Sequence, residues 1–133
     1  MAFYRTREGA ITAADSFTAL GSLYGQSTTA SVQLPKQATS IVGIIASVAS
    51  DSATNGATTF SVQLSGDGLS NGQETFCIGS QGVDGTPASN GMTNLPFTLD
   101  VAIPVIGSNQ VSIAGAMDTD VGTVAMAVTL VLA

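Results

Sequence analysis

The C-terminal segment of the chain, residues 121–133 (V-G-T-V-A-M-A-V-T-L-V-L-A), alternates large apolar side chains with small ones. The large set is Val124, Met126, Val128, Leu130 and Leu132. Because successive side chains of a β-strand point to opposite faces, this pattern predicts a long strand with one face in a core. No charged residue follows Asp120, so we expect the strand to lie inside a sheet or an interface. Ala125 and Ala127, on the small face, are predicted to lie where another sheet, loop or subunit comes close.

Similar alternation precedes this segment and predicts an all-β chain. Runs at residues 28–34, 40–50, 59–65, 74–79, 95–103 and 110–115 read as strands, and residues 15–24 predict a further short one. Residues 40–50 are apolar on both parities, which is typical of a centrally buried strand. About eight strands at this spacing indicate an antiparallel β-sandwich in a single domain.

Turn-forming residues separate these runs. Asn-Gly within residues 51–57 predicts a hairpin loop, and residues 66–72 predict a second turn. Residues 79–94 form the longest predicted loop, of the kind in which binding residues are often found. A connection of this length favours a crossing between the two sheets. We expect residues 1–9 to form an N-terminal arm and residues 10–133 to form the sandwich.

The surface of this chain carries unusually little charge. Charged residues make up 9% of the sequence, against about 25% in ordinary domains, and the mean hydropathy is +0.39. A dispersed monomer uses more charge than this to stay soluble, so the composition favours a subunit covered by copies of itself. The simpler alternative is a neutral monomer rich in Ser and Thr. No stretch of the sequence is long and apolar enough to predict a membrane span.

The net charge of −6 argues against one class of partner. Nine acidic residues stand against Arg5, Arg7 and Lys36. Because phosphate contacts dominate affinity for nucleic acids, the folded body is not expected to bind DNA or RNA directly. Phe3, Tyr4, Arg5 and Arg7 belong to the predicted arm, and we expect the arm to pack on another subunit.

Catalytic and metal chemistry find little support in the sequence. There is no His, and Cys77 is the single cysteine, so zinc and copper sites of the usual types are excluded and no cofactor is predicted. Calcium needs only oxygen ligands, which leaves Asp118 and Asp120 as candidates, although Asp in Gly-rich turns has a simpler conformational explanation.

The segment G-L-S-N-G around Ser70 matches the Gly-x-Ser-x-Gly pattern of hydrolases, but it precedes a strand and has no His to work with. We read it as a hairpin turn and predict that the protein is not an enzyme.

The strand pattern resembles the single jelly-roll coat proteins of tailless icosahedral viruses. The polar segment 1–8, the eight candidate strands, the low-charge Ser/Thr/Ala-rich faces and the terminal strand carry the resemblance. It implies an eight-stranded jelly-roll-like fold and a capsid or virion surface protein. Its partners would be copies of itself, with other virion proteins as further candidates, and its location the virion.

Two other functional classes remain open from the sequence. One is a subunit of a non-viral extracellular filament or surface layer assembled by strand exchange. The other is a small β-sandwich binding module that takes no part in an assembly.

Overall fold

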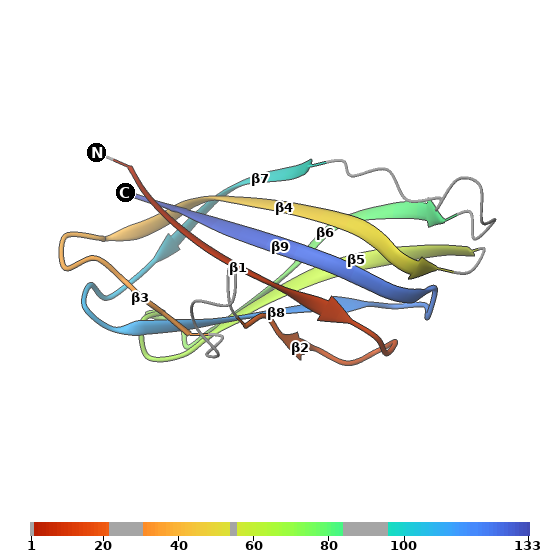
Figure 1. Ribbon diagram of the computed structural model, residues 1–133. Coiled ribbons are helices and arrows are strands. Elements are labelled where there is room, and N and C mark those ends of the chain that lie inside the picture. The colour runs from red at the N-terminus through yellow and green to blue at the C-terminus, as the bar shows by residue number, and fades with distance from the viewer. Residues whose placement is uncertain (1, 22–30, 54–55, 84–95) are drawn as a thin grey trace.

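The computed structural model describes residues 2–21, 31–53, 56–83 and 96–133. The described residues contain nine strands and no helix (Figure 1): β1 (Phe3–Ile11), β2 (Thr18–Ala19), β3 (Ser31–Gln33), β4 (Ser40–Ala53), β5 (Gly56–Ser65), β6 (Gln73–Val83), β7 (Pro96–Pro104), β8 (Gln110–Met117) and β9 (Gly122–Leu132). The prediction of an all-β chain is therefore confirmed. Accordingly, no described segment is a helix that could cross a bilayer.

The strands form two antiparallel sheets that face each other. One, sheet A, has the order β1-β9-β4-β7, and the other, sheet B, has the order β2-β8-β5-β6 with β3 also paired to β8. β2 and β3 pair with different parts of β8, so they occupy one strand position between them. Each sheet then has four positions, and successive strands lie in different sheets except β2 and β3, which share one position, and the β5–β6 hairpin. This is the order of an eight-stranded jelly roll, as the resemblance implies.

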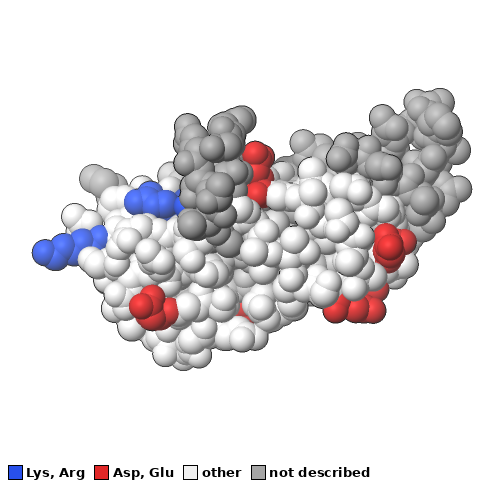
Figure 2. All heavy atoms as spheres, turned by 60° about the horizontal axis from the view of Figure 1, so that its bottom comes forward, with Lys and Arg blue, Asp and Glu red and all other residues white. Residues whose placement is uncertain are grey.

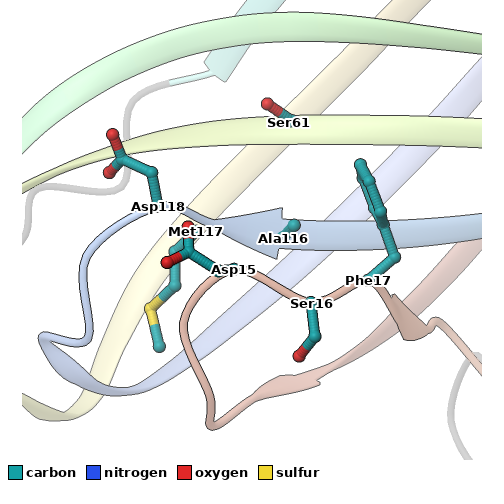
Figure 3. A pocket seen from close by; sticks show the side chains of 7 residues that line it. All are labelled: Asp15, Ser16, Phe17, Ser61, Ala116, Met117 and Asp118. Atoms are coloured by element: carbon teal, nitrogen blue, oxygen red, sulfur yellow. The ribbon is translucent and has the colours of Figure 1, made fainter.

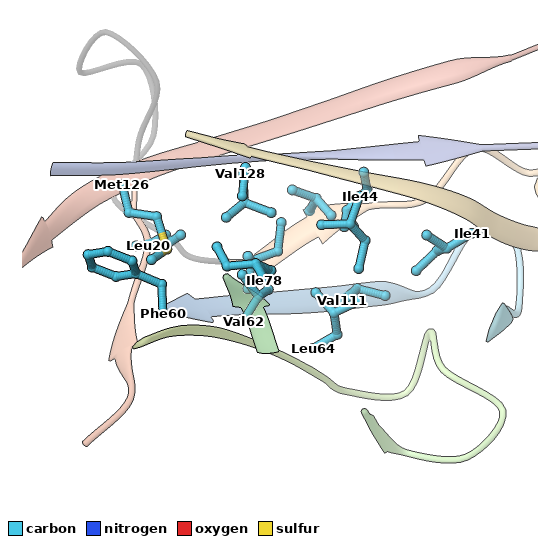
Figure 4. Close-up of a cluster of buried hydrophobic side chains, with 14 of the residues drawn as sticks. Leu20, Ile41, Ile44, Phe60, Val62, Leu64, Ile78, Val111, Met126 and Val128 are labelled. Carbon is cyan, nitrogen blue, oxygen red and sulfur yellow. The ribbon is translucent and has the colours of Figure 1, made fainter. Parts of the chain in front are cut away.

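The core fills the space between the two sheets (Figure 4). Along β9 the large parity points inward and is buried, as the alternation predicts. It meets the inward side chains of the opposite sheet, of which Phe60, Val62, Leu64, Val111 and Ile113 are fully buried. The last strand of the chain enters between β1 and β4, so it completes the middle of sheet A as the sequence predicts.

The structure differs from the prediction at the N-terminus. Residues 1–9 were expected to form an arm, yet Phe3–Ile11 is strand β1, paired with β9 along its whole length, from Phe3 opposite Leu132 to Ile11 opposite Val124. The arm interpretation arose because the segment lacks an apolar alternation. A strand at the edge of a sheet can form without such an alternation, because the side that has no neighbouring strand is open to solvent.

The segment 51–57 does not make the predicted hairpin. β4 continues to Ala53 and β5 begins at Gly56, and the two strands lie in different sheets. Turn residues reverse the chain direction but do not determine which sheet the returning strand joins. The turn at residues 66–72 is confirmed as the β5–β6 hairpin, and the crossing after β6 is confirmed too. Of the predicted loop 79–94, the first part extends β6 to Val83, and residues 84–94 lie outside the described residues.

Of the short strand predicted at residues 15–24, only Thr18–Ala19 is a strand among the described residues. It pairs with the end of β8 at Ala114 and Gly115. Phe17, just before this strand, is 40% exposed. Gly115 allows this end of β8 to pack closely, because a Cβ there would lie 2.5 Å from the Met126 sulfur.

Candidate assembly interface

The six residues expected to form the assembly interface lie on two different sides of sheet A. Phe3, Arg5 and Arg7 are opposite Leu132, Leu130 and Val128, whose side chains point into the core. They therefore belong to the inner face of β1. Tyr4 is opposite Val131, and Ala127 and Ala125 are opposite Glu8 and Ala10, which places all three on the outer face. The two sets have different roles.

Arg5 and Arg7 join the two sheets at one edge of the sandwich. Arg5 Nε donates to the main-chain oxygen of Gln33 at 3.2 Å, and Arg7 Nη2 donates to that of Ser31 at 3.0 Å. Both acceptors belong to β3, which lies in the opposite sheet. Each guanidinium also binds a carbonyl of its own strand, Tyr4 and Thr6 respectively, at 2.9 Å. Each arginine thus bridges the edge strands β1 and β3, using the planar set of donors that Arg provides.

Phe3 packs partly buried against the hydrophobic core. Together with the arginines it stabilises the subunit itself, which differs from the predicted location on an arm outside the sandwich. Tyr4, by contrast, is 60% exposed. Ala125 is exposed and Ala127 half-buried, on the central strand β9. Of the six residues, Tyr4, Ala125 and Ala127 share the outer face of sheet A, whereas Phe3, Arg5 and Arg7 are half-buried at its β1 edge.

The outer face of sheet A also carries two residues that the sequence analysis did not select. Val42 and Ile45 on β4 are 39% and 37% exposed. Ile45 is opposite Thr129 on β9 and Thr98 on β7, and Val42 occupies a β-bulge between Ile41 and Gly43. Residues 40–50 were read as buried on both faces, whereas Val42 and Ile45 are exposed on the outer one. The apolar residues on the second parity of this strand were the sequence signal for an exposed apolar surface.

A shallow hollow lies on the outer side of sheet B, at the end of β8. Its volume is about 260 Å³, and Asp15, Ser16, Phe17, Ser61, Ala116, Met117 and Asp118 line it. Figure 3 shows the Phe17 ring and the Asp118 carboxylate on opposite sides of Ala116. The loop before β2 is held here by the Asp15 N–H, which donates to the Met117 carbonyl at 2.9 Å. Asp15 has a φ of 56°, a left-handed conformation that Asp tolerates better than most residues.

The two calcium candidates hold turns. Asp118 Oδ1 accepts hydrogen bonds from the Thr59 N–H at 2.8 Å and the Thr58 hydroxyl at 3.0 Å. The Thr59 N–H, followed by the Thr58 hydroxyl, keeps the pKa of Asp118 below its ordinary value of 3.8. Asp120 Oδ1 accepts from the Gly122 N–H at 2.9 Å. Within the described ranges, no three His, Cys, Asp or Glu side chains come together as metal ligands.

Charged side chains are sparse on the face of the molecule in Figure 2, and they lie apart from one another on a largely neutral surface. Ser70 is exposed in the β5–β6 turn, where its N–H donates to the Pro104 carbonyl at 3.1 Å. Glu74 accepts a hydrogen bond from Asn71 at 3.0 Å in the same turn. Cys77 is an exposed free thiol on β6.

No family model matches the sequence, and no curated protein matches it either. Solved structures do match in fold. The vertex protein P5 of PRD1 is 9% identical with a TM-score of 0.50, and the match covers 96% of this chain and 94% of that one. The capsid of Helicobacter pylori bacteriophage KHP30 is 14% identical with a TM-score of 0.44, covering 100% and 94%.

The VP2 subviral particle of infectious bursal disease virus is 10% identical with a TM-score of 0.44, covering 99% of this chain and 36% of that one, so this chain spans about a third of VP2. Xylan-binding and xylanase structures also match, with TM-scores of 0.41 and 0.43. The resemblance to jelly-roll capsid proteins of icosahedral viruses is therefore one of fold.

Proposed function

We propose that this chain is a structural subunit of a self-assembling particle, a viral capsid or virion surface protein. The observation that carries the proposal is the complete jelly-roll strand order, since the chain supplies all eight strand positions. The fold likeness to the PRD1 vertex protein P5 supports it over nearly the full length of both chains. Because one fold serves many functions, the fold alone does not establish an assembly role. The further support has to come from the surface of this chain.

The surface supports an assembly subunit in two ways. Charged residues make up 9% of the sequence, and this chain supplies all eight strand positions of its own sandwich. The low charge is therefore a property of the surface of the folded subunit. Exposed large apolar side chains, Tyr4, Val42 and Ile45, lie together on the outside of sheet A. Patches of this kind on a folded chain mark contacts with other molecules.

Assembly by strand exchange, the filament alternative, finds less support in the geometry. Exchange needs an edge strand that can accept or donate a strand. At the β1–β3 edge, Arg5 and Arg7 already bind main-chain oxygens of both strands. An incoming strand would have to displace these hydrogen bonds.

Among the residues that the structure describes, the hollow beside Phe17 is a candidate site for the binding-module alternative. Its volume of about 260 Å³ falls below the range of about 300–1,000 Å³ for small-molecule pockets. Asp118, on its wall, already accepts hydrogen bonds from Thr58 and Thr59. We therefore place assembly ahead of ligand binding, and we expect no catalytic activity and a location in the virion.

Electron microscopy and sedimentation velocity of the purified chain test the proposal. Shells, rings or discrete oligomers are the expected result. Long fibres would favour the filament alternative. A protein that stays monomeric at high concentration, alone and when produced together with the proteins encoded beside it, would contradict a role as an assembly subunit.

A further inference from the structure

The outer faces of the two sheets differ in chemistry. On sheet B the outward positions of β5, β8, β3 and β6 are mostly hydroxyl and amide side chains: Ser61, Gln63, Ser65, Ser112, Ala114, Ser31, Gln33, Thr75 and Cys77. Several of these bind one another, as Ser31 with Ser112 at 2.9 Å and Gln63 with Thr75 at 3.4 Å. Most of this face is compatible with water, and its exposed large apolar side chain is Phe17, which lies beside Ala116 at the end of β8.

The outer face of sheet A is apolar by comparison. Its outward positions, named here the A face, are Tyr4, Thr6, Glu8, Ala10, Val42, Gly43, Ile45, Ser47, Thr98, Asp100, Ala125, Ala127, Thr129 and Val131. Its central row runs from Thr6 through Thr129 to Ile45, and the Thr6 and Thr129 hydroxyls bind each other at 2.9 Å. That pairing gives each of the two hydroxyls a partner within the sheet.

Charge on the A face is confined to its margins. Glu8 lies on β1 and Asp100 on β7, the two outermost strands of the sheet. Between them, β9 contains no charged residue, and β4 contains none before Asp51. The A face also lacks Lys and Arg, because Arg5 and Arg7 take inward positions on β1.

We propose that the A face is a contact surface between two copies of this chain, packed sheet against sheet with Ile45 and Thr129 near the centre. This inference rests on the proposed function. It adds which face of the subunit forms the contact and that the partner is a second copy of the chain. In such a contact each copy presents the same surface to the other around a two-fold axis. Sheets packed face to face bury their side chains at a separation of about 10 Å.

The charge distribution favours a second copy over a different partner. Two identical chains carry −6 each and repel, so contact through a face with little charge meets the least repulsion. A partner of opposite charge would instead be recognised through an acidic surface. The strand β9 and residues 40–50 of β4 carry no charge and form the centre of sheet A, which suits contact with an identical face.

The area of the A face is sufficient for such a contact. Four strands of about nine residues, about 4.8 Å apart and rising about 3.4 Å per residue, give roughly 600 Å² for each copy. Two copies then bury roughly 1,200 Å², at the lower limit of the range of about 1,200–2,000 Å² for stable interfaces. Such an area supports reversible pairing that further contacts in a particle would reinforce.

The test uses the full chain and charged substitutions at the centre of the A face. Ile45→Glu places a carboxylate from each copy near the axis, and we expect it to raise the dissociation constant of the pair at least about 100-fold, as measured by sedimentation equilibrium. Gln63→Glu, at the centre of the outer face of sheet B, adds the same charge and is expected to leave association unchanged. Thermal melts of both variants verify that they fold. If Ile45→Glu does not fold, Ala125→Glu takes its place, because Ala125 is exposed.

A mixture of two variants tests whether the partner at the A face is a second copy of this chain. Ile45→Lys alone is also expected to be monomeric, whereas equal amounts of Ile45→Glu and Ile45→Lys should pair, since opposite charges then meet. Absence of pairing in the mixture, with both single variants monomeric, would mean that the A face meets some other surface, and would overturn the proposal. Wild-type association in Ile45→Glu would overturn it as well.

Particle formation separates this inference from the proposed function. If the wild-type chain forms particles and Ile45→Glu forms them equally well, the A-face contact is wrong and the assembly role stands. If the wild-type chain forms neither pairs nor particles, the assembly role fails and the A-face contact fails with it.

Discussion

The guanidinium of Arg7 donates a hydrogen bond to the main-chain oxygen of Ser31, 3.0 Å away, and so links the edge strand of one sheet to the edge strand of the other. Arg5 repeats the arrangement two residues earlier, on the oxygen of Gln33. Two of the three cationic side chains in the sequence are thus engaged in closing one edge of the sandwich.

Replacing Arg7 with Met tests this closure. The substitution keeps the apolar stem but removes the donors to Ser31 and Thr6. Hydrogen bonds that involve a charged group contribute about 1.5–3 kcal/mol, so we expect a loss of about 1–3 kcal/mol in the free energy of unfolding, measured with urea. Hydrogen exchange should also speed up in β1 and β3. Lys36→Met, at an exposed position, is the matched control, and equal stability of the two variants would show that the link contributes nothing.

The N-terminal segment shows why sequence patterns fail at a sheet edge. Phe3, Arg5, Arg7, Gly9 and Ile11 share the inward parity of β1, although Arg normally marks an outward position. At the open edge of a sandwich, an arginine can point inward and still reach polar partners, because its long stem extends along the apolar side. Ser31 and Gln33 are far from β1 in the sequence. No local pattern therefore indicates that their carbonyls lie within hydrogen-bonding distance of these arginines. The strand was therefore read as an arm.

The interior of the sandwich was more predictable than its outside. The large parity of β9 is buried from Val124 to Leu132, as period-two alternation indicates. The same pattern cannot tell whether a second apolar parity is covered by the chain itself or by another molecule. Ile45 is an example, because its apolar character is visible in the sequence while its 37% exposure depends on the sheet order.

Leu130→Ala should be among the costly substitutions in the core. Leu130 is fully buried on the central strand β9, opposite Ile44. Lost transfer free energy and the remaining cavity together predict a decrease of about 2–5 kcal/mol in the free energy of unfolding, measured by denaturant titration. Val131→Ala, one residue later on the half-buried outer face, should cost clearly less. A similar cost at both positions would contradict the assignment of the two faces.

Gly107→Ala should be destabilising for a different reason. A Cβ at Gly107 would lie 2.3 Å from the main-chain oxygen of Lys36, and backbone cannot move aside as a side-chain end can. The two loops concerned are held together by hydrogen bonds between main-chain groups, including the Ser108 N–H to the Leu34 carbonyl at 3.2 Å. Overpacking of this kind costs about 1–3 kcal/mol, which a shift in the thermal midpoint would reveal. Gly9→Ala is the comparison, since its nearest atom is the Leu20 Cδ2 at 3.3 Å, and it should be milder.

The turn around Asp118 should make stability depend on pH in the acid range. The Thr59 N–H and the Thr58 hydroxyl favour the ionised carboxylate and lower the pKa of Asp118 in the folded state below 3.8. A group with a lowered folded pKa binds fewer protons when folded, so its contribution is fully present above the unfolded pKa. It is lost as the pH falls below 3.8 and through the folded value.

We therefore expect wild type to melt at a higher temperature than Asp118→Asn near neutral pH, because the amide is a weaker acceptor for the Thr59 N–H. The difference should shrink as the pH is lowered from about 5 to below 3.8 and disappear once the carboxyl is protonated in the folded state. Calorimetric melts of both proteins across this range measure it, with Asp100→Asn, an exposed site on β7, as the control for net charge. A difference between wild type and Asp118→Asn that stays constant down to the lowest pH would mean that ionisation of Asp118 does not stabilise the turn.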